Sequence, residues 1–157
     1  MNILITSVSS YVGRYIAKSL LLEGYSVAGT FRTHSPIIDN LIKRYGLTPI
    51  QHIYNYQSPI THLPEQYDII INSSGAFPFE DTTTEDVLAL NIKNSVFITN
   101  QILSQEKKPR ILIDYSTLSV YGDLRIDQIN DQTRPSPSNI YGSSKLLSEH
   151  ILDTLSN

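Results

Sequence analysis

The stretch "NILITSVSSYVGRYIAKSLLLEG", residues 2–24, decides the expected fold of this chain. Its first five residues are apolar and β-rich, which predicts a short strand over residues 2–6. From Tyr11 onward the apolar side chains recur with helical spacing, and Gly24 is a typical helix terminator. A strand followed directly by a helix is the first part of a β–α–β unit, so a parallel sheet is expected if the pattern repeats.

The pattern does repeat along the chain. Further strands are predicted at 25–32, 48–55, 67–75 and 109–117, with helices at 35–46, at 81–105 and after Asn139. Ser35 and Pro36 open the second helix, and Thr82 with Glu85 forms a capping box at the start of the third. The strands at 67–75 and 109–117 are apolar enough to be buried on both faces.

Strands alternating with helices predict right-handed crossovers and a parallel sheet covered by helices. We therefore expect a doubly wound α/β fold of the Rossmann type, with about five strands in the order 3-2-1-4-5. At 157 residues the chain is expected to form a single domain, residues 1–157. Ligands of such sheets bind beyond the carboxyl ends of the strands, so polar residues at those ends are the candidate site.

Composition excludes several classes of protein. The chain is 40% hydrophobic with a net charge of −3, which favours a globular domain and gives no electrostatic case for nucleic acid or an anionic membrane. It has no cysteine, and its four histidines are scattered, so no metal site is expected. No signal peptide and no spanning segment is recognisable, and a cytoplasmic location is expected.

The turn "TSVSSYVGRYI" from Thr6 to Ile16 follows the first predicted strand. A dinucleotide turn at this place needs small residues, because its backbone bends sharply and approaches a pyrophosphate at the helix N-terminus. Gly13 fits the close approach of helix and strand, whereas Ser7 and Ser10 stand where glycines are expected. A serine can donate to a phosphate, but a positive φ would cost it about 1 kcal/mol or more. An ordinary βα turn without a cofactor remains the alternative.

The second strand ends in "AGTFRTHS", with Arg32 and no acidic residue. An acid at this point would bind the ribose 2′-hydroxyl of NAD, whereas an arginine suits the 2′-phosphate of NADP. If a dinucleotide binds, NADP is therefore favoured over NAD. The alternative is a solvated surface arginine.

Near the other end, "SNIYGSSKLLSEHIL" places Tyr141 four residues before Lys145 on a predicted helix, so both lie on one face. A lysine ammonium beside a phenol favours the phenolate, which makes Tyr141 a candidate general acid or base. Ser116 and Thr117 follow the last predicted strand, where a hydroxyl can hold a substrate oxygen. Their alternative role is turn formation.

These motifs together resemble the extended short-chain dehydrogenase/reductases, also called the NAD-dependent epimerase/dehydratase family. The resemblance covers the whole chain, and it is carried by five stretches in the family's order. They are the first strand–turn–helix, "NSSGAFP" (72–78), "LNIKNSVFITNQIL" (90–103), "YSTLSVYGD" (115–123) and "SNIYGSSKLLSEHIL" (138–152).

The resemblance implies a role for individual residues. The catalytic group would be Thr117, Tyr141 and Lys145, with Lys145 also holding the nicotinamide ribose. The amides of Tyr11 and Val12 would meet the pyrophosphate, and Asn91 would support the active-site backbone. The full set of expected cofactor-binding residues is Ser7, Ser10, Tyr11, Val12, Gly13, Arg32, Ser73, Ser74, Gly75, Asn91 and Lys145.

The chain departs from the family pattern in two ways. Ser7 and Ser10 replace the first two glycines of Gly-x-x-Gly-x-x-Gly, and the last sheet strands and the substrate lobe of the family are lacking. One hypothesis is an NAD(P)-dependent epimerase, dehydratase or reductase acting on a nucleotide-sugar-like molecule. The other is a catalytically silent Rossmann module that binds a nucleotide weakly or a protein partner. In both cases strand 109–116 would end the sheet, so we expect a homo-oligomer or a second chain at this edge.

Overall fold

The structure is a computed structural model that describes residues 1–51, 66–78, 82–123 and 128–156. It divides into two compact units. The sheet unit comprises Met1–Ser74 and Gln101–Tyr115, and the helix unit comprises Gly75–Asn100 and Ser116–Asn157. Each unit is described by itself.

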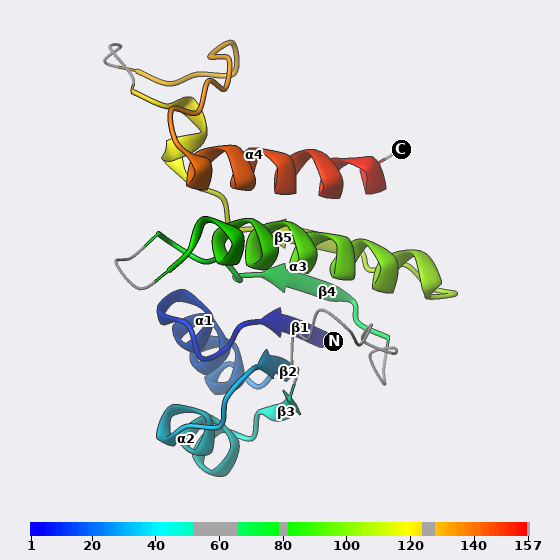
Figure 1. Cartoon of the computed structure of the whole chain (residues 1–157). Helices are drawn as coiled ribbons and strands as arrows, with labels where there is room; N and C mark the ends of the chain where they lie inside the picture. Colours follow the sequence, from blue (N-terminus) through cyan, green and yellow to red (C-terminus); the bar gives the residue numbers. More distant parts are fainter. Residues whose placement is uncertain (52–65, 79–81, 124–127, 157) are drawn as a thin grey trace. The chain divides into compact units, whose positions relative to one another are not determined.

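The sheet unit contains five parallel strands in the order β3-β2-β1-β4-β5, which confirms the predicted fold class and strand order (Figure 1). The strands are β1 (Asn2–Thr6), β2 (Ser26–Phe31), β3 (Thr48–Gln51), β4 (Ile69–Asn72) and β5 (Ile111–Asp114). The last four residues of the predicted strand 48–55 lie outside the described residues.

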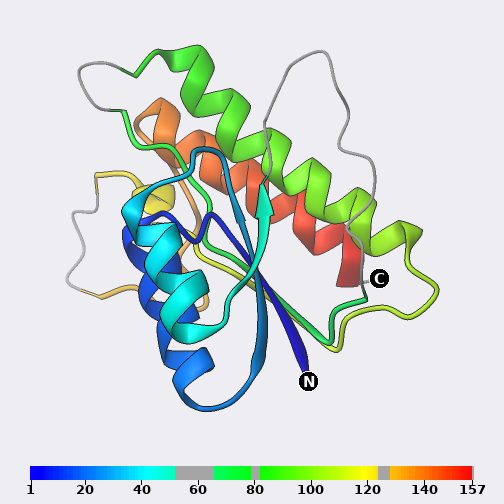
Figure 2. The same cartoon turned by 90° about the horizontal axis from the view of Figure 1, so that it is seen from below.

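Two helices follow the first two strands and cover one face of the sheet. Figure 2 shows α1 (Tyr11–Leu22) and α2 (Pro36–Tyr45) side by side against the strands. Their apolar faces and the strands form one buried core: Ile3, Ile5, Val8, Ala17, Val27, Phe31, Ile38, Leu41, Leu47 and Ile71. As predicted, α2 begins with Ser35 as its N-cap and Pro36 in its first turn, and it ends at Gly46 with φ 79°.

The prediction that the last strand is buried on both faces is wrong. Ile111 is 49% and Ile113 is 42% exposed, although both belong to β5. The reason is the position of β5 at the edge of the described sheet, where no β5 side chain joins the core formed with α1 and α2. The apolar composition of β5 therefore predicted apolar contacts on both faces, whereas the described residues provide such contacts on one face only.

The helix unit contains most of α3 (Thr84–Ser104), followed by η1 (Leu118–Tyr121), α4 (Ile140–Asp153) and η2 (Thr154–Ser156). The predicted capping box of α3 is displaced by one residue, from Thr82 to Thr83. The Thr83 Oγ1 accepts from the Asp86 amide at 3.1 Å, and the Thr83 amide donates to Asp86 Oδ2 at 3.2 Å. Three consecutive threonines allow several registers, and this one buries Val87 completely.

Within the helix unit, α3 and α4 contact each other through small polar side chains. Asn91 Nδ2 donates to Ser144 Oγ at 2.8 Å, and one turn further the hydroxyls of Ser95 and Ser148 are hydrogen-bonded. These side chains are all buried. Because they are short, they let the two helices approach closely while every hydroxyl in the pair keeps a partner.

Candidate cofactor and active site

The turn after β1 places Ser7 in the left-handed region of backbone conformation, with φ 56°. The Ser7 amide donates to Thr30 Oγ1 at 3.0 Å, and the Ser7 carbonyl accepts from the Ser10 amide at 2.9 Å. These bonds fix the turn against β2. Ser7 thus adopts a conformation that favours glycine, at a cost of about 1–2 kcal/mol.

Ser10 behaves differently, because its φ of −68° and ψ of 163° suit any residue. It is the N-cap of α1, and its Oγ accepts from the Gly13 amide at 3.0 Å. The amides of Tyr11 and Val12 occupy the first two helical positions, where no carbonyl within a helix can accept from them. The N-terminus of α1 therefore presents two backbone amides together with the positive end of the helix dipole.

Gly13 has the close packing that the sequence predicts. A Cβ at this position would lie 2.5 Å from the Ser7 carbonyl oxygen and 2.7 Å from Ser73 Oγ. Ser73 in turn donates from Oγ to the Thr6 carbonyl at 2.5 Å, which joins the ends of β1 and β4 beneath the helix. The structure thus brings Ser7, Ser10, Gly13 and Ser73 together, and their contact with a cofactor stays a prediction.

A row of polar side chains crosses the carboxyl ends of three neighbouring strands. Thr6, Asn72 and Asp114 are register partners on β1, β4 and β5. Asn72 Oδ1 accepts from Thr6 Oγ1 at 2.7 Å and from Ser74 Oγ at 2.6 Å, while Asn72 Nδ2 donates to Asp114 Oδ1 at 2.5 Å. The side chain of Ser74 therefore holds the strand ends, and its amide also donates to Asn72 Oδ1, at 3.3 Å.

Sequence reasoning did not single out Thr6, Asn72 or Asp114. The signal was available, because each is a polar residue that closes an otherwise apolar strand. In the described part of the chain, Asp114 Oδ2 is buried without a hydrogen-bond partner.

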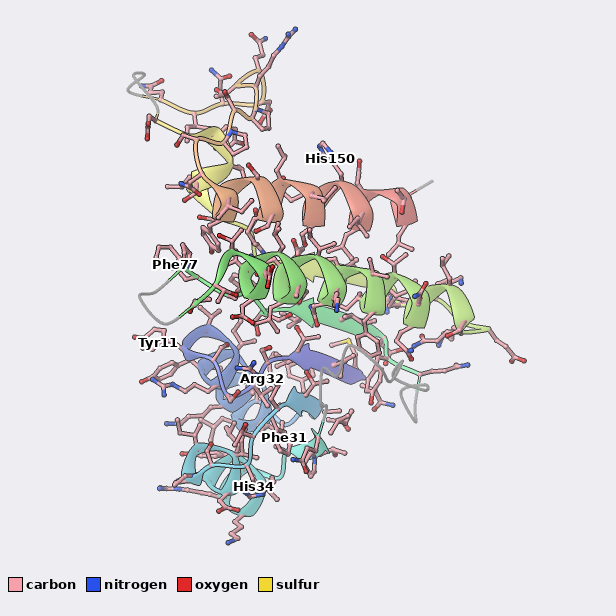
Figure 3. All side chains as sticks on the ribbon, viewed as in Figure 1. Tyr11, Phe31, Arg32, His34, Phe77 and His150 are labelled. Carbon is pink, nitrogen blue, oxygen red and sulfur yellow. The ribbon has the colours of Figure 1, made fainter. Side chains whose placement is uncertain are left out.

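Arg32 directly follows β2 and is exposed, and its carbonyl accepts from Gln51 Nε2 at 3.3 Å. None of the ion pairs found among the described residues involves Arg32. Figure 3 labels it together with His34, whose ring contacts Phe31 at 5.8 Å and whose Nε2 lies 3.7 Å from Asp39 Oδ1. Arg32 thus lies at the end of the second strand, and none of these ion pairs includes its guanidinium.

In the helix unit, Asn91 connects the loop after β4 to α4. Its Oδ1 accepts from the Ala76 amide at 2.8 Å, and its Nδ2 donates to the Ala76 carbonyl at 3.3 Å as well as to Ser144. Ser144 Oγ donates to the Tyr141 carbonyl at 2.8 Å. Asn91 therefore holds the Ala76 backbone directly, whereas its support of an active-site backbone stays a prediction.

Tyr141 lies in the first turn of α4, which Asn139 caps by accepting from the Gly142 amide at 2.8 Å. The Tyr141 ring packs edge-to-face against Phe77, with centroids 4.9 Å apart. Figure 3 labels Phe77, which is 51% exposed and belongs to the loop that Asn91 fixes. Lys145, one turn after Tyr141, is only 2% exposed.

The two hydroxyl residues after β5 have separate roles. Thr117 is the N-cap of η1, and its Oγ1 accepts from the Ser119 amide at 3.2 Å, the turn-forming role that was its alternative. Ser116 donates from Oγ to Glu149 Oε1. The hydroxyls of both residues are thus engaged, because Thr117 Oγ1 also donates to Ser119 Oγ, at 3.3 Å.

Comparison with known proteins decides the family. Residues 3–157 match the model of the NAD dependent epimerase/dehydratase family. The chain belongs to this family. A curated relative is the decarboxylating sterol-4-alpha-carboxylate 3-dehydrogenase of Dictyostelium discoideum, 22% identical over 157 residues, with 96% of this chain and 47% of the relative covered.

Solved structures of other members of the family share the fold. The UDP-glucuronic acid 4-epimerase from Bacillus cereus in complex with NAD has a TM-score of 0.80 at 21% identity, covering 98% of this chain and 52% of that one. The UDP-glucose 4-epimerase from Bifidobacterium longum in complex with NAD+ and UDP has a TM-score of 0.77 at 18% identity, covering 99% and 49%. This member of the family thus spans about half the length of the relatives it matches.

No helix in the described ranges is long and apolar enough to cross a bilayer. No group of three or more potential metal-ligating side chains occurs in that part of the chain either.

Proposed function

We propose that residues 1–157 form the NAD(P)-binding domain of an epimerase, dehydratase or reductase that acts on a nucleotide-sugar-like molecule. Family membership supports the reaction class, and the epimerases among its structural relatives support the kind of substrate. Because the chain spans about half of those relatives, the remaining wall of the substrate site would come from further polypeptide.

The observation that carries the proposal is the conformation of the turn from Ser7 to Gly13. Serine stands in place of glycine at Ser7, yet the backbone has the positive φ that glycine would provide. Strained backbone conformations are concentrated at ligand-binding and catalytic sites, so the strained Ser7 supports a ligand at this turn. The residues fit a pyrophosphate: Tyr11 and Val12 offer amides, and Ser10 Oγ accepts from Gly13, so its own proton can be donated.

Arg32 supports NADP as the preferred cofactor. It follows the strand that reaches the adenosine ribose in such folds, and none of the described carboxylates pairs with it. A guanidinium presents a fork of donors that matches a phosphate. Binding of NAD without a 2′-phosphate would leave this charge unused.

In the proposed reaction, Tyr141 takes the proton of a substrate hydroxyl, and Thr117 Oγ1 orients that hydroxyl. A nicotinamide, when bound, would supply the hydride acceptor for oxidation of that alcohol to a carbonyl. The Lys145 ammonium, one turn away on α4, stabilises the phenolate before the proton arrives. Asn91 holds the Ala76 backbone and, through Ser144, the first turn of α4, so it acts as a positioning residue.

The exposed face of β5 supports a protein partner. Ile111, Ile113 and Tyr115 alternate along the strand and are each more than 40% exposed. We propose that a second chain, or a second copy of this one, covers this edge. The same face favours the second candidate function, a catalytically silent module that serves mainly as a partner-binding domain.

Titration of NADPH and NADH by calorimetry separates these functions. Micromolar binding with NADPH preferred is expected, and Arg32→Gln should remove the preference while NADH affinity stays unchanged. Absence of binding at millimolar concentration would favour the silent module. Where turnover of a sugar nucleotide is found, Tyr141→Phe should abolish it, and retained turnover would remove this phenol from the reaction.

A further inference from the structure

We propose that Arg14 is a further cofactor-binding residue, whose guanidinium contacts the pyrophosphate of the dinucleotide. This inference rests on the proposed function and adds a residue to the same site. Arg14 directly follows Gly13 and is the fourth residue of α1. Nothing in the sequence distinguishes it from a solvated arginine, and the evidence comes from its surroundings.

Two tyrosine rings hold the guanidinium near the start of the helix. Arg14 Cζ lies 5.1 Å from the centroid of the Tyr11 ring and 5.2 Å from that of Tyr15. The two rings contact each other edge-to-face at 5.1 Å. Cation–π contacts of this kind restrict a side chain that would otherwise sample many rotamers. The arginine is thus preorganised, although Tyr11 and Tyr15 are 71% and 52% exposed.

The side-chain direction that is usual on a helix would bring the charge of Arg14 toward the phosphate turn. Long side chains on a helix point back toward its N-terminus. Arg14 accordingly lies against Tyr11, the first residue of α1, which Figure 3 labels. The amide of Tyr11 is one of the two that are directed at the proposed pyrophosphate.

The charge of Arg14 is not balanced by the described protein. Helix α1 has no acidic residue between Tyr11 and Leu22, and none of the ion pairs of the described residues includes Arg14. A cation near a helix N-terminus is opposed by the helix dipole. An anionic ligand at the turn would reverse this balance, because the phosphate would interact with the guanidinium and the dipole together.

Arg14 and Arg32 are therefore expected to serve different parts of the cofactor. Arg14 would contact a group that NAD, NADP and ADP share, so it should strengthen the binding of all three. Arg32 would contact only the 2′-phosphate, which NADP alone carries. Comparison of the affinities for the three ligands therefore distinguishes a second arginine that contacts a phosphate from a general electrostatic effect of its charge.

The test is calorimetric titration of ADP, NADH and NADPH into the wild-type chain and three variants. Arg14→Gln should weaken all three ligands by the same factor, on the order of tenfold, as expected for one charged hydrogen bond. Arg14→Lys keeps the charge without the fork and should lose less. Lys18→Gln is the matched control, because Lys18 lies one turn further along α1, where it contacts Tyr45 at 5.4 Å. It should leave every affinity unchanged.

The outcomes distinguish failure of the proposed role of Arg14 from failure of the proposed function. Wild-type binding with equal affinity in Arg14→Gln would overturn the inference and leave the proposed function standing. A loss confined to NADPH would overturn the pyrophosphate assignment, since Arg14 would then contact the 2′-phosphate. A wild-type chain that binds none of the ligands at millimolar concentration would overturn both. Circular dichroism of each variant checks the fold, and Arg14→Lys retains a test if Arg14→Gln does not fold.

Discussion

The substitution Ser7→Gly should stabilise the fold, because it removes backbone strain and leaves the contacts of the turn in place. Ser7 has φ 56°, which costs a non-glycine residue about 1–2 kcal/mol. The hydrogen bonds that fix the turn use the Ser7 amide and carbonyl, and glycine retains both groups. The change therefore acts on conformational energy alone.

The expected magnitude follows from two opposing terms. Relief of strain contributes about 1–2 kcal/mol, whereas the greater freedom of glycine in the unfolded chain costs about 0.4–1 kcal/mol. The difference between these ranges is about 0–1.6 kcal/mol, so the expected gain in the free energy of unfolding is near their middle, about 0.8 kcal/mol. For a chain of 157 residues this corresponds to a rise in melting temperature of roughly 1–4 °C.

Differential scanning calorimetry and urea unfolding measure this gain directly. Ser7→Ala is the matched control, because alanine retains the Cβ and hence the strain while losing the hydroxyl. It should show no stabilisation. If Ser7→Gly unfolds at the same temperature as the wild type or below it, the left-handed turn is not the strained element that we infer.

Three further predictions concern the same framework. Gly13→Ala should destabilise the fold by about 1–3 kcal/mol in urea unfolding, since its Cβ would meet a carbonyl at 2.5 Å; an unchanged midpoint would contradict the close packing. Asn91→Ala should cost about 1–3 kcal/mol by leaving the Ala76 amide unsatisfied. Asn91→Asp keeps that acceptor but loses the donor to the Ala76 carbonyl and to Ser144 and buries a carboxylate, so it should cost at least as much. The amide of Asn2 donates to Asp68 and lowers the pKa of that carboxyl from 3.8 in the folded state. The contribution of Asp68 to stability is therefore present above pH 4 and is lost as the pH falls through the lowered pKa. In urea unfolding, the free energy of unfolding of Asp68→Asn should accordingly change less between pH 6 and pH 3 than that of the wild type.

The sequence predicted those features that depend on local chemistry. Strand order followed from the alternation of strands and helices, and Ser35, Gly46 and Asn139 mark helix ends because their caps use neighbouring amides. The position of Gly13 was also predictable, since a helix that follows a strand after a short turn must pack closely on it.

Features that depend on contacts between distant segments were not predictable. The capping box moved from Thr82 to Thr83, because the burial of Val87 selects among registers that are locally equivalent. The exposure of β5 reflects its place at the sheet edge, which its own apolar composition does not report. The position of Arg14 between two rings is a local feature of α1, but it depends on side-chain rotamers that spacing alone leaves open.

The side-chain amide of Asn72 has a fixed polarity, and Asp114 is the residue that sets it. If the amide were rotated by half a turn, its oxygen would face the carboxylate oxygen of Asp114, and the two would repel each other. In the favoured orientation the hydroxyl protons of Thr6 and Ser74 are both directed inward, toward the amide oxygen. A negative charge on the outermost strand thus governs how protons are arranged two strands away, without any movement of the backbone between them.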